Sequence, residues 1–387
     1  MITPRPANYR SEVYSFIIEQ EGPRPDPYFD TANPPRATIG YGFNIEVREY
    51  LLLALDQMGI TAGRTANETN TILNQFTAVI QSAPDGNDVQ LKINLDALAQ
   101  FYGAPSFNVS APQSDNVFYN ILGGTTVNGI KVTGKETRLD GIIGNVLPHD
   151  SKEYVALMSL FYNSEGLVKA GSKLATAVIN GDRAEAWYEI RYNSNADRQH
   201  ASRRYSEADE FALYNAAPTE DDYKSAYRML TRHKDTILGS DGVPGGAVGY
   251  EDRFPPLSGS GLEAQLSLAT AYFRSTYSLG TNIAWHDVLV DGDTSQTLLA
   301  TDRDTALMGE GGTDTLIGKA GNDVLIGGVG NDTLYGGLGT DTYLYNPGDG
   351  HDTIEDSNGQ NKILIDTATL TGSTKPAYQN QDEHIMV

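Results

Sequence analysis

Carboxylates recur at a fixed spacing of nine residues in the C-terminal part of the chain. The sequence over 309–344 reads GEGGTDTLI, GKAGNDVLI, GGVGNDTLY and GGLGTDTYL, with glycine at the first and fourth positions and aspartate at the sixth. Glycine allows a six-residue turn to adopt backbone conformations that other residues avoid. Such a turn directs backbone carbonyls and one carboxylate inward, and these are the hard oxygen ligands that Ca²⁺ prefers. We therefore expect calcium at these turns.

The last three residues of each nonapeptide predict a short strand with an apolar or aromatic side chain at its centre. The central residues are Leu316, Leu325, Leu334 and Tyr343. Two nonapeptides then make one coil of a parallel β-roll, and ions lie between the turns of alternate repeats. This pattern resembles the RTX calcium-binding repeats from about residue 307 to about residue 366.

The RTX resemblance implies a set of calcium ligands. The expected carboxylates are Asp314, Asp323, Asp332 and Asp341. The expected backbone carbonyls, at the first and third positions of each turn, belong to Gly309, Gly311, Gly318, Ala320, Gly327, Val329, Gly336 and Leu338. Asp349 and Asp352 are weaker candidates in the terminal cap. Glu310 and Lys319 stand in the place of the second glycine, so the first two turns are predicted to be less regular.

The charge balance is consistent with a cation-binding region and argues against nucleic acid as a partner. The net charge is −22, and residues 251–387 hold 6 basic against 20 acidic residues. Phosphate binding needs a basic surface, whereas uncompensated carboxylates favour counter-cations. There is no cysteine, no basic and apolar leader at the N-terminus, and no apolar run of the ~20 residues that a membrane span needs.

The RTX resemblance also implies export. Members of this family leave the cell by type I secretion, without a cleaved N-terminal signal. A roll with sites of roughly 10⁻⁴–10⁻³ M would stay unfolded in the cytoplasm and fold where calcium is abundant. We therefore expect a protein that is secreted, or delivered to the periplasm of target bacteria, with the type I machinery as a partner.

A second group of polar residues lies in EGPRPDPYFDTANPPRATIGYG, residues 21–42. Glu21 ends a predicted helix, Asp30 follows in a proline-rich turn, and Thr38 precedes a Gly-x-Gly strand. This order resembles the phage-type lysozymes, glycoside hydrolase family 24. Three further segments, in the family's order, support the resemblance: ALMSLFYNSEG (156–166), SKLATAVINGDRAEAWYEI (172–190) and ASRRYSEADEF (201–211). The sequence departs from the family by two extra residues near 34–35 and by Phe43 where a histidine commonly stands.

The lysozyme resemblance implies roles for five residues. Glycoside hydrolysis needs a protonated acid on the leaving oxygen and a second carboxylate that activates water or stabilises the oxocarbenium ion. Glu21 is expected to be the general acid and Asp30 the base or stabiliser, with Thr38 holding the water. Tyr41 and Asn163 are expected in the sugar groove. Arg203 and Arg204 can pair with Glu21 or, as we favour, with Glu207.

The elements that would position these residues define a multidomain chain. We expect a mainly α, lysozyme-like α+β catalytic domain over residues 1–235, with an insertion within about 54–150 that includes a polar loop at 102–116. A linker and a connecting helix (about 261–278) span 236–300. The RTX β-roll covers 301–366 and a C-terminal tail covers 367–387.

The predicted activity is hydrolysis of the β-1,4 bond between N-acetylmuramic acid and N-acetylglucosamine in peptidoglycan, which needs no cofactor for the chemistry itself. The absence of H-E-x-x-H and G-x-S-x-G excludes the zinc-protease and lipase patterns. Two enzymatic alternatives stay open, a lytic transglycosylase and a chitinase on the same fold. An inactive wall-binding module is the third. Asp30 favours hydrolysis, because transglycosylases use a single glutamate.

Overall fold

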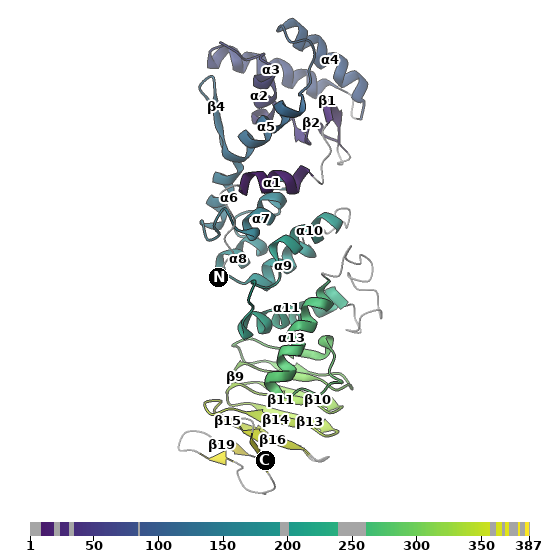
Figure 1. Ribbon diagram of the computed structural model, residues 1–387, viewed down its shortest axis with the longest axis vertical. Coiled ribbons are helices and arrows are strands. Elements are labelled where there is room, and N and C mark those ends of the chain that lie inside the picture. The colour runs from purple at the N-terminus through teal and green to yellow at the C-terminus, as the bar shows by residue number, and fades with distance from the viewer. Residues whose placement is uncertain are drawn as a thin grey trace. The chain divides into compact units, whose positions relative to one another are not determined.

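Packing divides the chain into two compact units, Met1–Gly181 and Asp182–Val387, and each unit is described by itself (Figure 1). The computed structural model describes residues 9–18, 24–30, 35–83, 86–193, 201–238, 261–356, 361–365, 368–370, 378–379 and 384–386. The boundary falls inside residues 1–235, which the sequence predicts as one domain. Packing alone does not decide which segments act together, so the predicted domain limits stay a prediction.

The first unit combines eight described helices with two small antiparallel sheets. The helices are α1 (Tyr9–Ile18), α2 (Arg48–Gln57), α3 (Ala66–Ser82), α4 (Asp88–Phe101), α5 (Ala111–Gly123), α6 (Lys135–Ile143), α7 (Lys152–Asn163) and α8 (Lys173–Asn180). The three-stranded sheet has the order β1 (Arg24–Phe29), β2 (Ala37–Gly40), β3 (Phe43–Asn44), and the hairpin pairs β4 (Thr125–Val127) with β5 (Ile130–Val132). Helix α7 is buried from Glu153 to Phe161 and packs against α1. The unit is therefore an α+β structure built around α7.

Side-chain caps explain where the helices of the predicted insertion begin. Thr65 and Glu68 form a reciprocal capping box at the start of α3. Ser110 and Gln113 do the same for α5, with a proline in its first turn. The prediction of a loop over 102–116 is therefore wrong for its last residues, because this cap starts a helix inside a polar segment.

The second unit begins with helices and continues into the roll. The helices are α9 (Arg183–Arg191), α10 (Ala201–Phe211), α11 (Glu220–Leu238) and α13 (Leu262–Tyr277), followed by the 3₁₀ turn η2 (Trp285–Asp287). Helix α13 agrees with the helix predicted at about 261–278. Helix α11 packs against α9, α13 and the first strand of the roll, so the helical part of this unit is continuous with its sheets.

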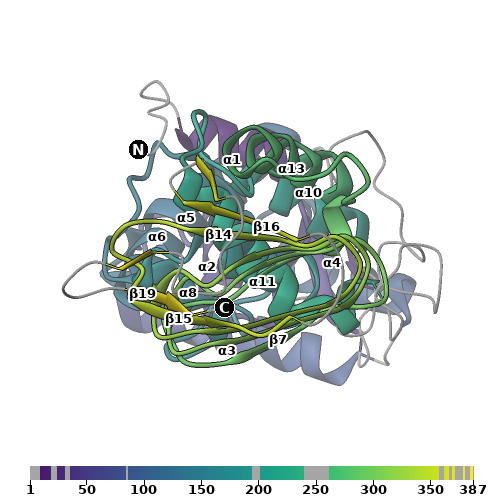
Figure 2. The ribbon, with the colours of Figure 1, turned by 90° about the horizontal axis from the view of Figure 1, so that it is seen from below.

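Two six-stranded sheets form the roll. One has the order β18 (Tyr378–Gln379), β19 (His384–Met386), β15 (His351–Ile354), β13 (Thr333–Leu338), β10 (Thr315–Ala320), β7 (Thr297–Leu299). The other has the order β17 (Ala368–Leu370), β16 (Lys362–Ile365), β14 (Thr342–Tyr345), β11 (Val324–Ile326), β8 (Ala306–Met308), β6 (Val288–Val290). Viewed along the roll in Figure 2, the sheets form the two long sides of a flattened coil. A short pair, β9 (Gly311–Gly312) with β12 (Val329–Gly330), joins successive turns.

The register of the sheets repeats every 18 residues, or two nonapeptides. Leu316 pairs with Leu334, and Leu325 pairs with Tyr343, in parallel strands. The central residues of successive strands are buried in one narrow core. The predicted parallel β-roll is thus confirmed. Strands β6, β7, β17, β18 and β19 lie outside the predicted limits of 301–366, so the sheets extend beyond the repeats that the sequence motif identifies.

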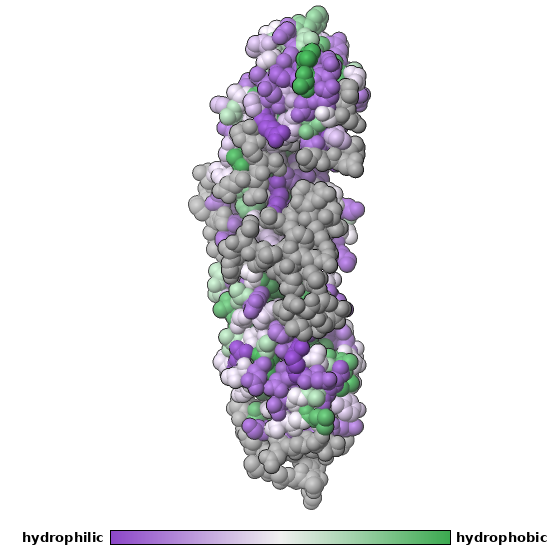
Figure 3. Space-filling view, turned by 90° about the vertical axis from the view of Figure 1, so that its right-hand side faces the viewer, coloured by the Kyte–Doolittle hydropathy of each residue, from purple (hydrophilic) through white to green (hydrophobic). Residues whose placement is uncertain are grey.

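The described residues on the face shown in Figure 3 are mainly hydrophilic. On the face shown in Figure 3, strongly hydrophobic residues form small separate areas among hydrophilic ones. Helix α4 contributes the exposed apolar residues Val89, Ile93 and Phe101. Within the described residues, no helix is both long enough and apolar enough to cross a bilayer.

Candidate functional site

The position-six aspartates of the four repeats are buried at the ends of their turns. Asp314, Asp323, Asp332 and Asp341 are at most 1% exposed. In each, Oδ1 accepts a backbone N–H from the turn one coil earlier. Asp332 accepts from the Asp314 amide at 2.7 Å, and Asp341 accepts from the Asp323 amide at 2.8 Å. The carboxylates therefore fix the stacking of successive turns.

The second oxygen of each of these aspartates has no protein partner. Oδ2 of Asp314, Asp323, Asp332 and Asp341 is buried and makes no hydrogen bond within the part of the chain that the structure describes. A buried carboxylate oxygen without a partner is costly, and paired or metal-bound oxygens are the usual solution. Four equivalent orphaned oxygens, one in each repeat, indicate a ligand that recurs with the repeat.

The first glycine of each repeat leaves the space into which these oxygens are directed. A Cβ built on Gly309 would lie 2.6 Å from Asp314 Oδ2 and 2.5 Å from the carbonyl oxygen of Gly327, in the next turn of the same stack. The same Cβ on Gly318 would meet Asp323 Oδ2 and the carbonyl oxygen of Gly336. Carboxylate and carbonyl oxygens thus converge on a space beside a glycine, and any side chain at that glycine would fill the space. The donor set fits Ca²⁺.

The electrostatics of these turns favour a bound cation. Burial raises the pKa of Asp314 to about 6 and that of Asp323 to about 7, and neighbouring carboxylates of the same stack contribute to both shifts. Burial also raises the pKa values of Asp332 and Asp341. Within the described ranges, no group of three or more His, Cys, Asp or Glu side chains could hold a metal. An ion here therefore has at most two carboxylates and depends on backbone carbonyls for its remaining ligands.

The predicted carbonyl ligands lie in the six-residue segments that end at the position-six aspartates, several of them within β9, β10, β12 and β13, and their surroundings differ with position. Of the first-position carbonyls, those of Gly327 and Gly336 border the spaces beside Gly309 and Gly318. At the third position, the carbonyl of Leu338 accepts the Gly321 amide at 2.9 Å. The remaining carbonyl oxygens that the sequence predicts as calcium ligands belong to Gly309, Gly311, Gly318, Ala320 and Val329.

The two weaker candidates divide into different roles. Asp352 accepts the Asp332 amide at 3.0 Å, as a position-six residue would, and burial raises its pKa to about 7. Its spacing of 20 rather than 18 residues from Asp332 reflects a two-residue insertion in the register, since Thr333 pairs with Thr353. Asp349 instead caps its own turn, where its Oδ2 accepts the Asn346 amide at 2.6 Å.

Two further repeats precede the four that the motif identifies. Thr297 pairs with Thr315 and Ala306 with Val324, which places 291–299 and 300–308 in register with the nonapeptides. Their position-six residues are Gln296 and Thr305 instead of aspartate. The sequence motif does not reveal these repeats, although the nine-residue phase with apolar residues at position eight (Leu298 and Leu307) continues upstream of residue 309.

The departures from glycine in the first two turns have different surroundings. Glu310 (φ 70°) and Lys319 (φ 73°) both adopt the left-handed conformation that favours glycine. Glu310 forms an ion pair of 2.9 Å with Lys224 of α11. Although burial opposes the charge, the bond to Glu310 and the nearby Glu220 raise the pKa of Lys224 above its ordinary range. Glu310 therefore fastens helix α11 to the first turn of the motif repeats.

The predicted catalytic residues are only partly described. Glu21 lies outside the described residues. Asp30 directly follows β1, where its Oδ1 accepts the Arg36 amide at 2.8 Å and its own amide donates to Arg36 O at 2.9 Å. These two bonds join Asp30, which follows β1, to Arg36, which precedes β2. Thr38 is buried in β2, and its hydroxyl donates to Tyr28 O at 3.2 Å.

The predicted sugar-groove residues make internal hydrogen bonds. Tyr41 is buried, and its hydroxyl donates to Asp115 of α5 at 2.9 Å. Tyr14 of α1 shares the same carboxylate oxygen at 2.6 Å, and burial followed by the bond to Asp115 raises the pKa of Tyr14. Asn163, at the end of α7, donates to Ser159 O at 2.7 Å. The two tyrosine bonds join α1 and the turn between β2 and β3 to α5, and the bond of Asn163 stays within α7.

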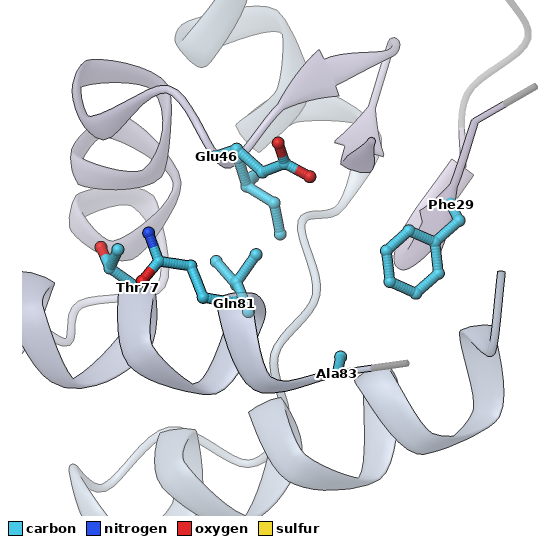
Figure 4. Close-up of a pocket in the computed structure, with 7 residues that line it drawn as sticks. Phe29, Glu46, Thr77, Gln81 and Ala83 are labelled. Atoms are coloured by element: carbon cyan, nitrogen blue, oxygen red, sulfur yellow. The ribbon is translucent and has the colours of Figure 1, made fainter. Parts of the chain in front are cut away.

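Two cavities lie beside β1, where the predicted insertion packs against the sheet. One of about 200 Å³ is lined by Phe29, Glu46 and residues of α3, with Thr77 and Gln81 on the helix below Glu46 (Figure 4). The other, of about 390 Å³, lies between β1 and the start of α4. Asp88 of α4 also accepts the Phe29 amide at 2.7 Å. The insertion therefore borders the strand that directly precedes Asp30.

The paired arginines of α10 have a structural partner. Arg203 donates to Glu207 at 3.3 Å, and Arg204 donates to the other oxygen of the same carboxylate. Glu207 is fully buried. The favoured pairing of these arginines with Glu207 is confirmed.

Comparison with known families identifies residues 308–343 as four copies of the RTX calcium-binding nonapeptide repeat. This match covers the turns with the four orphaned aspartate oxygens. It confirms the RTX prediction and with it calcium binding, but it extends over a small part of the chain. Comparison with curated proteins found no match.

Proposed function

We propose that this chain is an exported muramidase that hydrolyses the β-1,4 bond between N-acetylmuramic acid and N-acetylglucosamine in peptidoglycan. Its N-terminal region would carry the chemistry and its RTX roll would bind calcium. The lysozyme-like residue pattern of the sequence motivates the proposal. The order of the first unit supports it: a helix precedes a three-stranded antiparallel sheet, which precedes a helical region built around α7.

The observation that carries the proposal is the position of Asp30. This carboxylate stands at the end of β1, fastened to the backbone of Arg36 by one of its oxygens. A carboxylate fixed in this way is suited to stabilise positive charge that develops on a sugar ring or to orient a water molecule. In the proposed reaction, Glu21 donates its proton to the leaving glycosidic oxygen.

The proposal assigns a structural role to two of the predicted residues. The hydroxyl of Thr38 is bonded to the backbone of β1, and Tyr41 is buried with its hydroxyl on Asp115. Their contribution is to hold β2 against β1 and α5, and thereby to position Asp30. Substrate contacts are assigned instead to the cavities beside β1.

Calcium supplies charge compensation to the roll when it is bound, and no step of the hydrolysis runs through it. RTX repeats accompany type I secretion, and the low cytoplasmic calcium concentration would keep the roll unfolded before export. Folding would follow where calcium is abundant. Delivery to the periplasm of target bacteria is one destination consistent with a wall substrate.

Clearing of a purified cell-wall suspension by the full chain in calcium tests this function. Glu21→Gln should abolish clearing and Asp30→Asn should reduce it by about 10²-fold or more, because each removes a reacting group. Glu49→Gln, which changes an exposed glutamate of α2, should clear at the wild-type rate.

Three outcomes would contradict the proposal. Clearing by Glu21→Gln at the wild-type rate would remove the assignment of the acid. Full activity of Asp30→Asn, with loss in Glu21→Gln, would instead indicate a transglycosylase, which uses one acid. Tight wall binding without release of soluble fragments by the wild type would indicate a binding module.

A further inference from the structure

Asp291 is a buried carboxylate upstream of the motif repeats, and its second oxygen has no partner among the residues that the structure describes. It is 7% exposed, and its Oδ1 accepts the Gly292 amide at 2.7 Å. Its Oδ2 is buried in the same unpartnered state as the four motif aspartates. Asp291 belongs to no RTX nonapeptide match, which begins at residue 308.

The register places Asp291 at the first position of a turn. Val290 pairs with Met308, and the Asp291 amide donates to Met308 O at 2.9 Å, so Asp291 stacks on Gly309. A side chain at Gly309 would enter the space between its turn and the next one, beside Asp314 Oδ2. By the same geometry, the side chain of Asp291 enters the space between turns 291–296 and 309–314.

The position-six residue of this first turn does not supply a carboxylate. Gln296 is exposed, and its side-chain amide donates to Thr294 Oγ1 at 3.0 Å. Its backbone amide donates to Asp314 Oδ1 at 2.8 Å, which keeps the stacking of the motif turns. In this turn, position one is aspartate instead of glycine, and position six is glutamine instead of aspartate. The carboxylate still reaches the space between the turns, but from the other position.

The cations nearest Asp291 have other partners. Arg228 and Arg232 of α11 face Asp291 and oppose the rise of its pKa that burial causes. Arg232, however, lies 2.6 Å from Glu185, and Arg228 lies 3.8 Å from Glu310. Neither forms an ion pair with Asp291 in the described structure, so a bound cation would compensate the charge of its orphaned oxygen when the carboxyl group is ionised.

We propose that Asp291 holds an additional calcium ion between turns 291–296 and 309–314, outside the repeats that the motif defines, with the Gly309 carbonyl in the place that the Gly327 carbonyl takes one turn later. The opposite edge of the same coil has no counterpart. There the first and sixth positions are Ala300 and Thr305, and the threonine hydroxyl donates to Arg303 O. The first coil thus binds an ion on one edge only.

The test is the number of calcium ions bound by the folded full chain, counted by native mass spectrometry. Asp291→Asn should bind one ion fewer than the wild type. Asp304→Asn changes a carboxylate of the opposite turn that accepts the Asn322 amide at 2.7 Å, and it should leave the number unchanged. The double variant D291G/Q296D restores the motif arrangement and should regain the ion that Asp291→Gly alone loses.

An unchanged ion number in Asp291→Asn would overturn the proposal. So would a double variant that is folded by circular dichroism but still lacks the ion. Equal loss of stability of Asp291→Asn in calcium and in EGTA would also overturn it, because a carboxylate that serves only the contact with α11 would show no calcium dependence. The double variant keeps the test decisive if Asp291→Asn folds poorly.

Discussion

Replacement of Asp323 by asparagine should stabilise the roll without calcium and have a much smaller effect with calcium. The Asp323 side chain is fully buried, its Oδ1 accepts the Thr305 amide at 2.8 Å, and its Oδ2 has no partner in the described protein. Asparagine has nearly the same shape, so its amide oxygen can keep the bond to Thr305. The substitution therefore removes the charge while leaving the stacking of the turns intact.

Without calcium, Asp323→Asn should stabilise the roll. The pKa of Asp323 is raised from 3.8 to about 7 by burial. Each unit of pKa difference is worth ~1.4 kcal/mol, so the ionised form costs the metal-free fold at most ~4 kcal/mol. Relaxation of the turn around the charge takes up part of this cost, and a gain of ~1–3 kcal/mol is expected near pH 8.

With calcium, the same substitution should lose most of this stabilising effect. At about 10 mM calcium, a site with a dissociation constant of roughly 10⁻⁴–10⁻³ M contributes ~1–3 kcal/mol to the free energy of unfolding. Asp323→Asn removes the charged oxygen next to the carbonyl of Gly336 and hence this contribution. The stabilisation that Asp323→Asn gives without calcium should therefore shrink by ~1–3 kcal/mol in calcium, to a net change near zero.

Urea unfolding of the full chain, followed by the far-ultraviolet signal of the roll, measures both values. Asp304→Asn serves as the control, because this residue bonds the Asn322 amide without an orphaned oxygen. It should change the stability by the same small amount in calcium and in EGTA. A loss of stability of equal size for Asp323→Asn in both conditions would refute the assignment of its Oδ2 to an ion.

Three further predictions concern the roll. In the folded roll the aspartates have pKa values of up to about 7, above those of the unfolded chain. The metal-free roll should therefore be most stable near pH 4 and lose stability as the pH rises to about 7. Urea midpoints in EGTA that rise with pH over this range would contradict this prediction. Gly318→Ala should lower the calcium-bound stability by ~1–3 kcal/mol because a Cβ enters the space of the ion. Gly280→Ala, with open space around it, should change this stability by less than ~0.5 kcal/mol. Equal shifts of the melting temperature for the two variants would count against the site. Glu310→Gln should cost ~1–2 kcal/mol through loss of the ion pair with Lys224, in calcium and in EGTA alike; an unchanged melting temperature would show that this contact does not fasten α11.

The sequence predicts the roll well because each nonapeptide contains the residues that specify its own turn, calcium ligand and strand. The position-six aspartates, the parallel register and the buried centre at Leu316 follow from the nine-residue period alone. The upstream repeats do not match the motif because Gln296 and Thr305 replace the diagnostic aspartate. There the shape persists through stacking on the next coil, which the local sequence does not encode.

The N-terminal site is less predictable because its residues depend on distant partners. Tyr41 is the middle residue of the Gly-x-Gly segment, but its hydroxyl is bonded to Asp115, 74 residues later. Burial of Thr38 likewise depends on how the sheet packs. Sequence spacing identifies which residue types lie near the turn, whereas long-range packing decides which of them face a cavity.

Mass spectrometry of the fragments released from purified peptidoglycan by the full chain in calcium tests the central claim most directly. The proposed muramidase should release muropeptides with reducing N-acetylmuramic acid ends, and Glu21→Gln should release none. Fragments with 1,6-anhydro ends would assign the chain to the transglycosylases. The absence of any soluble fragment from the calcium-bound wild type would contradict an enzymatic role on this substrate.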